Sequence, residues 1–393
     1  MSIYRHLARR KQIKRWHLGI LIGSLIVFIG AFGFVRSQDS LLYDSEVPSD
    51  DKVATVAEVV PVKKPPEHIK TPNVVKAVYM TSWVAGTPSI REKLLAFVEN
   101  SEFNSVVIDV KDYTGFIAFE TDDAVINAME STEKRIPDIR GIIEELHRKN
   151  MYVIGRVSVF QDPYVAKKKP EWAVLTKSGA VWKDRKGLSF IDPGAEGYWD
   201  YIIHIARASA DAGFDEINFD YIRYPSDGNL QNAVFPYAKG REKQIVLEDF
   251  FKYVDREFQV QNVATSADLF GLVTWAEDDL GIGQVLERAA PYFDFIAPMV
   301  YPSHYASGFE GYKNPAEHPY EIIKVSMDRG VERMKKLGQD PLKLRPWIQD
   351  FDLGADYGVA EILAQKKAIY DAGLNSWMSW DPKNQYTQGA YQK

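Results

Sequence analysis

FDEINFDYIRYPSDG, residues 214–228, joins an apolar run to a carboxylate and a turn. The run contains Ile217 and Phe219, stops at Asp220, and is followed within a few residues by Pro-Ser-Asp-Gly. Similar β-type runs recur along the chain, and several of them also end at an acid. In a (β/α)8 barrel the strands fill the core, and the functional side chains lie at their C-terminal ends. The stretch therefore predicts one strand of such a barrel, with Asp220 at its mouth.

The same pattern occurs eight times. The segments expected to be strands are 74–83, 103–112, 152–160, 214–222, 263–271, 293–301, 344–351 and 375–381. Amphipathic helical patterns lie between them, for example at 136–150, 196–213 and 361–373. Eight strand–helix units fit a (β/α)8 barrel, which typically needs about 250 residues and tolerates insertions. An open, doubly wound sheet is the alternative, but it would usually have a Gly-rich phosphate loop after its first strand, and TSWVAGTPS (81–89) is not one.

The amino terminus has the pattern of a membrane anchor. Residues 1–16 carry six basic side chains and no acid, and residues 18–35 carry no charge. An apolar helix of about 20 residues spans the hydrocarbon core, and its basic flank stays in the cytoplasm. We therefore expect a single-pass anchor at 17–36, with the C-terminal domain outside the cell. The alternative is a cleaved signal peptide and a secreted protein, although the sequence around Arg36 offers no clean cleavage site.

Residues 37–74 are rich in acids and proline and show little periodicity. Such a segment buries too little apolar surface to offset the entropy of ordering. We therefore expect a flexible stalk, followed by a barrel domain at 75–393. The alternative is a strand at 55–62 that packs on the domain.

Composition excludes several classes of function. The chain has no cysteine, which excludes disulfides, thiolate metal sites and a cysteine nucleophile. Outside its basic amino terminus the chain is acidic, so nucleic acid is not an expected partner. The sequence has no HxH, HExxH or GxSxG pattern, so we expect no metal, no cofactor and no serine nucleophile. No feature indicates a protein partner.

Polar and aromatic side chains follow the predicted strands. The candidates for the barrel mouth are Asp109, Lys111, Arg156, Asp192, Asp220, Arg223, Asp268, Tyr301, His304, Trp347, Gln349, Asp350 and Trp380. Asp220 is the strongest, because it follows its apolar run directly and Arg223 lies close enough in sequence to steer its ionisation. Asp268 ends the next strand at the same depth. Trp172 and Trp182, in the long loop after strand 152–160, are expected at the lip of a substrate cleft.

Paired acids with aromatic neighbours are typical of enzymes that break glycosidic bonds. Adjacent parallel strands lie about 4.8 Å apart, so Asp220 and Asp268 could reach the separation of roughly 5–5.5 Å found in retaining glycosidases. One carboxylate would attack the anomeric carbon, and the other, with a raised pKa, would protonate the leaving oxygen. Any single acid could instead only cap a helix or pair with an arginine.

The motifs VYMTSW, VVIDVKDYTG, FIDPG, EINFDYIRYPSDG, SADLFG and APMVYPSHY resemble a bacterial family of glycoside hydrolase-like barrels, over about residues 75–390. The resemblance implies a (β/α)8 fold distantly similar to the α-amylase clan. By position it implies Asp220 as nucleophile, Asp268 as acid/base and Asp350 as a further catalytic acid. The chain departs from the clan at Asn218, where the clan has an arginine, and at Asp268, where the clan typically has a glutamate.

Three functions fit these patterns. The first is a membrane-anchored glycoside hydrolase that cleaves cell-wall or extracellular polysaccharide. The second is a catalytically inactive, carbohydrate-binding barrel at the cell surface. The third is another barrel chemistry, such as a lyase or a phospho-sugar enzyme. It is disfavoured because Asp350, Asp352 and Asp381 crowd the region where a barrel normally binds phosphate.

Overall fold

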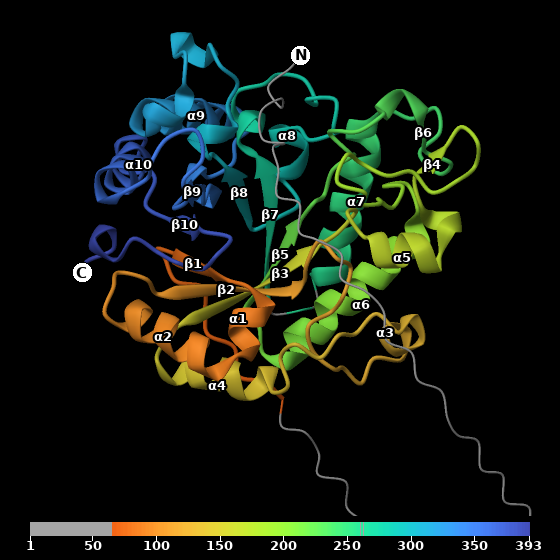
Figure 1. The fold of residues 1–393 in the computed structure, drawn as a ribbon, viewed down its shortest axis with the longest axis horizontal. Coiled ribbons are helices and arrows are strands. Elements are labelled where there is room, and N and C mark those ends of the chain that lie inside the picture. The colour runs from red at the N-terminus through yellow and green to blue at the C-terminus, as the bar shows by residue number, and fades with distance from the viewer. Residues whose placement is uncertain (1–64, 260, 262) are drawn as a thin grey trace, which may run out of the picture. The chain divides into compact units, whose positions relative to one another are not determined.

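The computed structural model describes residues 65–259, 261 and 263–393. Eight parallel strands close into a barrel in the order β1-β10-β9-β8-β7-β5-β3-β2 (Figure 1). The barrel strands are β1 (Lys76–Met80), β2 (Ser105–Lys111), β3 (Tyr152–Ser158), β5 (Glu216–Asp220), β7 (Ala264–Phe270), β8 (Phe295–Met299), β9 (Trp347–Gln349) and β10 (Trp377–Trp380). The predicted barrel is confirmed, and its closure excludes the open sheet.

Helices surround the barrel (Figure 1). They are α1 (Ser82–Gly86), α2 (Pro88–Glu99), α3 (Ala124–Met129), α4 (Ile139–Arg148), α5 (Pro163–Lys168), α6 (Glu196–Ala212), α7 (Lys243–Phe258), α8 (Leu286–Ala289), α9 (Pro319–Lys336) and α10 (Val359–Asp371). Local sequence fixes their ends. Asp138 caps α4 by accepting the N–H of Gly141, and Gly213 ends α6 in the left-handed region at φ 114°.

The barrel core has two layers, because successive residues of a strand face opposite sides. Side chains such as Ala77, Tyr79 and Ile154 fill the interior of the barrel. Their neighbours, such as Val78 and Val153, face outward and pack against the helices. The inward series leads up to the polar side chains at the C-terminal ends of the strands, which we call the mouth.

The long loop after β3 is folded and not an open lip. It forms a small antiparallel ribbon with the loop after β5, from β4 (Leu175–Thr176) and β6 (Ala233–Val234). Trp182 lies inside this unit, 1% exposed, and its indole N–H donates to the carbonyl of Asn229 at 3.0 Å. Trp172 packs against Tyr198 of α6. The expectation that these two tryptophans line a substrate cleft is therefore wrong, because Trp182 belongs to the core of the loop unit and Trp172 packs against the main core.

The ordered domain begins before residue 75. The backbone N–H of Ile69 donates to Asp215 at 2.7 Å, and the hydroxyls of Thr71 and Tyr152 lie 3.0 Å apart. Residues 65–74, expected to belong to the stalk, therefore pack on the N-terminal end of the barrel. The segments predicted at 1–16 and 17–36, the remainder of the stalk and the alternative strand at 55–62 lie outside the described residues. Within the described ranges, no helix is long and apolar enough to cross a bilayer.

Candidate active site

Arg156 holds two carboxylates together at the mouth. It rises from β3, and its guanidinium pairs with Asp220 of β5 through Nη2 and through Nε, the latter at 3.1 Å. Its Nη1 donates to Asp109 of β2 at 2.6 Å, and the hydroxyl of Tyr79 donates to the other oxygen of Asp109 at 2.5 Å. All four side chains are buried. Burial acts to lower the pKa of Arg156, but the charges of Asp220 and Asp109 raise it well above its usual value.

Asp268 of β7 lies beside this cluster in a different environment. One of its oxygens accepts two neutral donors, the amide of Asn218 at 2.9 Å and the indole N–H of Trp347 at 2.8 Å. Its other oxygen lies 3.7 Å from Nε of Arg156. Burial, followed by the negative charge of Asp220, raises the pKa of Asp268 to about 8. A carboxyl with that pKa is mostly protonated at neutral pH.

The strand register brings Asp220 and Asp268 to the same depth. Asn218 of β5 lies opposite Ser266 of β7, so two residues further on Asp220 and Asp268 face each other across the pair. Each has an oxygen near the same Nε of Arg156, at 3.1 and 3.7 Å, so these oxygens are at most about 6.8 Å apart. One carboxyl is paired with a cation and the other is held by neutral donors, which is how a site separates the protonation states of two acids.

Tyr221, directly after Asp220, has a left-handed backbone with φ 53°. This conformation is uncommon for a bulky residue and costs on the order of 1–3 kcal/mol unless the surroundings hold it. Here the N–H of Tyr221 donates to the carboxylate of Asp220 at 2.5 Å, and its ring lies 5.1 Å from the guanidinium carbon of Arg223. The backbone thus both fixes Asp220 and places an aromatic ring beside it.

A cavity of about 350 Å³ opens over the acids. Its polar lining includes Asp220, Asp268, Arg156 and Arg223, and its rings come from Tyr221, Phe270, Tyr301, His304, Tyr305, Trp347 and Trp380. Trp380 stacks on Tyr79 with the ring centroids 3.8 Å apart. Burial raises the pKa of Tyr301 and lowers that of His304, so both are neutral at pH 7. Apolar rings around a few convergent polar groups are typical of a small-molecule site.

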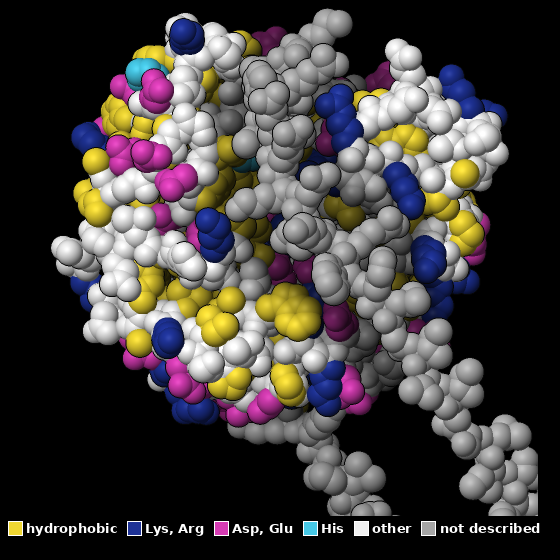
Figure 2. Space-filling view, in the orientation of Figure 1, with side chains coloured by type: hydrophobic (Ala, Val, Ile, Leu, Met, Phe, Trp, Pro, Cys, Tyr) yellow, Lys and Arg dark blue, Asp and Glu magenta, His cyan; other side chains and the backbone are white. Residues whose placement is uncertain are grey.

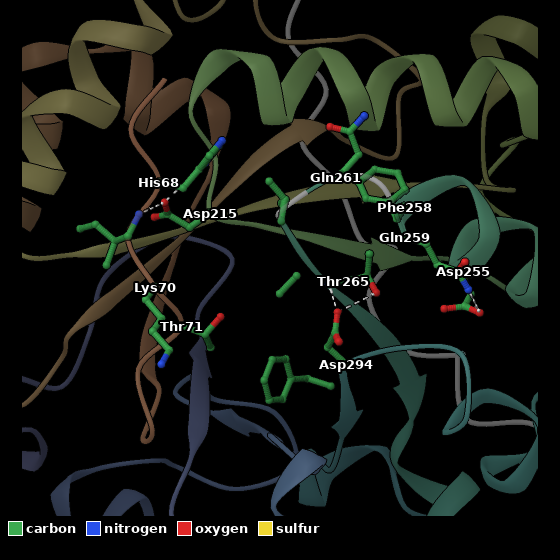
Figure 3. Close-up of a pocket in the computed structure, with 14 residues that line it drawn as sticks. His68, Lys70, Thr71, Asp215, Asp255, Phe258, Gln259, Gln261, Thr265 and Asp294 are labelled. Atoms are coloured by element: carbon green, nitrogen blue, oxygen red, sulfur yellow. Dashed lines mark hydrogen bonds and ion pairs between the residues drawn. The ribbon is translucent and has the colours of Figure 1, made fainter. Parts of the chain in front are cut away.

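A larger cavity, of about 710 Å³, lies at the opposite end of the barrel (Figure 3). It is lined by residues at or just before the start of the strands, such as Asp215, Thr265 and Asp294. There the carboxylate of Asp215 faces His68, and Asp294 accepts the backbone N–H of Thr265 at 2.8 Å (Figure 3). In (β/α)8 barrels the active site lies at the C-terminal ends of the strands, whereas residues at the N-terminal end serve stability. We therefore place the candidate active site in the smaller cavity.

Of the predicted residues, eight share one place. Arg156, Asp220, Arg223, Asp268, Tyr301, His304, Trp347 and Trp380 line the mouth cavity. Asp109 lies behind them and contacts Arg156 and Tyr79. Arg223 does not pair with Asp220, because Arg156 of the neighbouring strand takes that role.

Lys111 does not reach the cavity. The register of β2 shifts between Asp109, which lies opposite Arg156, and Lys111, which lies opposite Val157. This irregularity turns Lys111 to the outer face of the barrel, where its ammonium lies 2.9 Å from Asp162 and donates to the carbonyl of Ser158 at 2.7 Å. Its contacts are therefore structural, contrary to the substrate-binding role expected for it.

Asp350, Asp192 and Gln349 are also occupied by the protein itself. Asp350 accepts the N–H and hydroxyl of Thr387 and the hydroxyl of Tyr391, so it fastens the C-terminal segment to the barrel. Asp192 accepts the backbone N–H of Gly194 at 2.9 Å and that of Tyr237 at 2.7 Å. Gln349 contacts Ser303 and Phe351. None of the three lines the mouth cavity. Their polar atoms are hydrogen-bonded instead to loops and to the C-terminal segment near the strand ends.

Sequence reasoning missed Tyr79, Tyr221 and Phe270 as neighbours of the acids. Alternation along β1 could have found Tyr79, because Ala77 and Tyr79 share the inward face. Phe270 follows Asp268 by two residues and so lies on the same side of β7. The left-handed turn at Tyr221 leaves no sequence signal that we can identify.

The family model described as "Putative glycosyl hydrolase domain" matches residues 77–386. A search of curated proteins gave no match. Among solved structures, a hypothetical protein from Ruminiclostridium thermocellum ATCC 27405 is 30% identical, with a TM-score of 0.45; the match covers 52% of this chain and 98% of that one.

Two further structures are glycoside hydrolases. The glycoside hydrolase domain of PgaB (BpsB) from Bordetella bronchiseptica is 13% identical, with a TM-score of 0.58; 81% of this chain and 99% of that one are covered. The α-galactosidase TtGalA from Thermus thermophilus is 12% identical, with a TM-score of 0.49 and coverage of 81% and 60%. At these identities the likeness to PgaB shows the fold alone.

Proposed function

The chain belongs to the family described as "Putative glycosyl hydrolase domain", and on that premise we propose that it hydrolyses O-glycosidic bonds of a cell-wall or extracellular polysaccharide. The observation that carries the proposal is a buried pair of acids in unlike environments. Asp220 is paired with Arg156, whereas Asp268 is held by two neutral donors.

In this proposal Asp268 is the general acid. Its pKa of about 8 keeps a proton on the carboxyl at neutral pH, available to the leaving oxygen. Asp220 is the nucleophile or the stabiliser of the oxocarbenium-like transition state, since Arg156 and the N–H of Tyr221 hold its two oxygens in place at the mouth. Asp350 is not proposed as a third catalytic acid, because its carboxylate is used by Thr387 and Tyr391.

The separation of the acids favours retention of configuration. Retaining enzymes hold their carboxyls about 5–5.5 Å apart, and inverting enzymes hold them about 6.5–9.5 Å apart. The bound of about 6.8 Å between the two oxygens near Arg156 overlaps only the lower edge of the inverting range. We therefore propose a covalent glycosyl-enzyme on Asp220, which water releases after Asp268 has changed from acid to base.

The remaining lining residues have roles in binding. Trp380, Trp347 and Tyr301 offer flat apolar faces against which a sugar ring can pack, and His304 is a neutral hydrogen-bonding group at the rim. Asn218 replaces the arginine that the α-amylase clan has at this place. Arg156, its register partner on β3, puts a guanidinium at the same level of the barrel.

Localisation is a separate proposal that rests on the sequence. Residues 18–35 anchor the protein, with the barrel outside the cell, as the basic side chains of residues 1–16 predict. Treating intact cells with an external protease tests this arrangement. Degradation of the barrel without lysis is expected, and a fully cytosolic, protease-protected protein would contradict it.

The second candidate is a barrel that binds glycans without cleaving them, since the same rings would serve either function. A reducing-end release screen on bacterial cell-wall and exopolysaccharide preparations separates the two. We expect the wild type to release sugars and Asp220→Asn to lose turnover while keeping the fold. Asp220→Gly with added azide should regain activity and give the inverted product. Near-normal kcat in Asp220→Asn would remove it as nucleophile, and binding without release by any variant would favour the silent barrel.

A further inference from the structure

Arg223 is a buried cation without a carboxylate partner. Its side chain is 9% exposed, and in the part of the chain that the structure describes no acidic oxygen lies within 4.0 Å of its guanidinium. Nη1 donates to the carbonyl of Tyr224 at 3.0 Å and to the hydroxyl of Ser226 at 3.4 Å. Nε and Nη2 donate to no described group. A buried charge is normally paired, so this exception needs a reason.

Aromatic rings hold the guanidinium in place. The guanidinium carbon lies 4.9 Å from the ring centroid of Phe270, 5.1 Å from that of Tyr221 and 5.7 Å from that of Phe190. Burial lowers the pKa of Arg223, yet an arginine remains charged at neutral pH. The ring faces offset part of the desolvation cost, but they supply no acceptor for the free N–H groups.

Arg223 also joins two cavities. It lines the mouth cavity together with Asp220 and Asp268, and it lines a second cavity of about 480 Å³ that also contains Gln161 and Ser226. Tyr221 is the other residue common to both. A chain of sugars that lies over the reacting acids and continues into the second cavity would pass the guanidinium.

The other buried cations near the mouth are already neutralised. Arg156 pairs with Asp109 and Asp220, and Lys111 pairs with Asp162. The described part of the face in Figure 2 carries both acidic and basic side chains, so its surface does not present a single sign to an approaching ligand. Lys186 also lines the second cavity but is exposed, so among the described residues that line these two cavities Arg223 is the buried cation without a carboxylate partner.

We infer that the substrate is an acidic glycan and that Arg223 binds the carboxylate of a sugar residue next to the scissile bond. The inference rests on the glycosidase function proposed above. The planar guanidinium matches a carboxylate through two parallel N–H···O bonds. Asp184 and Asp227 line the second cavity and disfavour a multiply charged group such as a phosphate, whereas a single carboxylate can be matched by Arg223.

The test measures binding and not turnover. Full-length protein carrying Asp220→Asn is titrated calorimetrically with tetragalacturonate, a hyaluronan tetrasaccharide and a glucuronate-containing xylo-oligosaccharide. Each is compared with its carboxyl-reduced counterpart, which has the same size and linkage but no charge. We expect at least one acidic form to bind roughly tenfold more tightly than its reduced form, as a charge-assisted contact predicts. If no acidic form is preferred, the inference is wrong.

Variants of Arg223 assign the preference. Adding Arg223→Gln should remove the difference between acidic and reduced forms, and Arg223→Lys should keep part of it. Lys239→Gln removes the same charge from an exposed position and should leave the preference unchanged. Thermal melts check that each variant is folded. Equal weakening of both ligand forms by Arg223→Gln and Arg223→Lys would show that the arginine only supports the loop, and would overturn the inference. Because the readout needs no hydrolysis, the two proposals can fail separately: if the wild-type protein releases no sugar while Asp220→Asn still prefers the acidic form, the hydrolase function is contradicted and the role of Arg223 is not.

Discussion

At the scale of single residues, the protonation of Asp268 should control the pH dependence of activity. Its carboxyl must carry a proton to act as general acid, and its pKa is about 8. We expect kcat/KM for substrates with poor leaving groups to be high at neutral pH and to fall about tenfold per unit above pH 8. The pH–rate profile measures this limb. Asp268→Asn, assayed on an activated aryl glycoside, should show no such fall in kcat/KM at high pH. If the fall persists in that variant, a group other than Asp268 is the general acid.

The same residue should lower the stability of the fold. Because burial raises the folded-state pKa of Asp268 above the unfolded value, the folded chain holds a proton that the unfolded chain releases. The contribution of Asp268 to stability is therefore present at low pH and is lost as pH rises from about 4 to about 8. Asp268→Asn should raise Tm above wild type by a margin that widens across this range. Asp211→Asn, on the exposed face of α6, is the control, and a constant margin would contradict the assignment.

At the scale of elements, the irregularity in β2 makes a separate prediction. Lys111→Met should reduce the free energy of unfolding by about 3–5 kcal/mol, because it leaves Asp162 charged and buried without its partner. Binding of substrate should be unchanged, since Lys111 faces away from the cavity. Urea unfolding measures the loss of stability, and KM reports substrate binding. Lys93→Met, on the exposed face of α2, should change neither quantity. If Lys111→Met raises KM and leaves stability unchanged, Lys111 contacts the substrate after all.

The elements also show what the sequence could predict. The ends of the apolar runs placed Asp220 and Asp268 at the mouth correctly, because β5 and β7 pair without interruption. The same reasoning failed in β2, because a one-residue irregularity does not disturb an apolar pattern such as VVIDV. It also failed beyond the strand ends, where the partners of Asp350 come from a segment 37 residues away. Arg156, 64 residues from Asp220, pairs with it through strand register, which local spacing cannot reveal.

At the scale of the whole molecule, residues 65–74 belong to the folding unit. A chain that starts at residue 75 loses the N–H of Ile69 from Asp215 and the hydroxyl of Thr71 from Tyr152. We expect it to be less stable than a chain starting at residue 65 by about 1–3 kcal/mol, because buried acceptors lose their donors. Its kcat should be unchanged, since these contacts lie at the far end of the barrel.

Urea unfolding of the two chains measures the difference. Thr71→Val in the longer chain removes one hydroxyl and should account for a minor part of the loss. If the two chains unfold with equal urea midpoints and equal slopes, residues 65–74 do not stabilise the barrel and belong to the stalk, as the sequence predicts.

The C-terminal residues reach the same end of the barrel as residues 65–71. The carbonyl of Tyr391 accepts the N–H of Glu102, and Lys393 donates to the carbonyl of Glu99, beside the start of β1 where Glu102 pairs with Lys76. Both ends of the described chain therefore leave the barrel at the end opposite the mouth cavity. A resin, a fluorophore or a fusion partner attached to either end will keep clear of an entering polymer. Immobilised layers of this domain should consequently present every mouth cavity to the surrounding liquid, without any re-engineering of its loops.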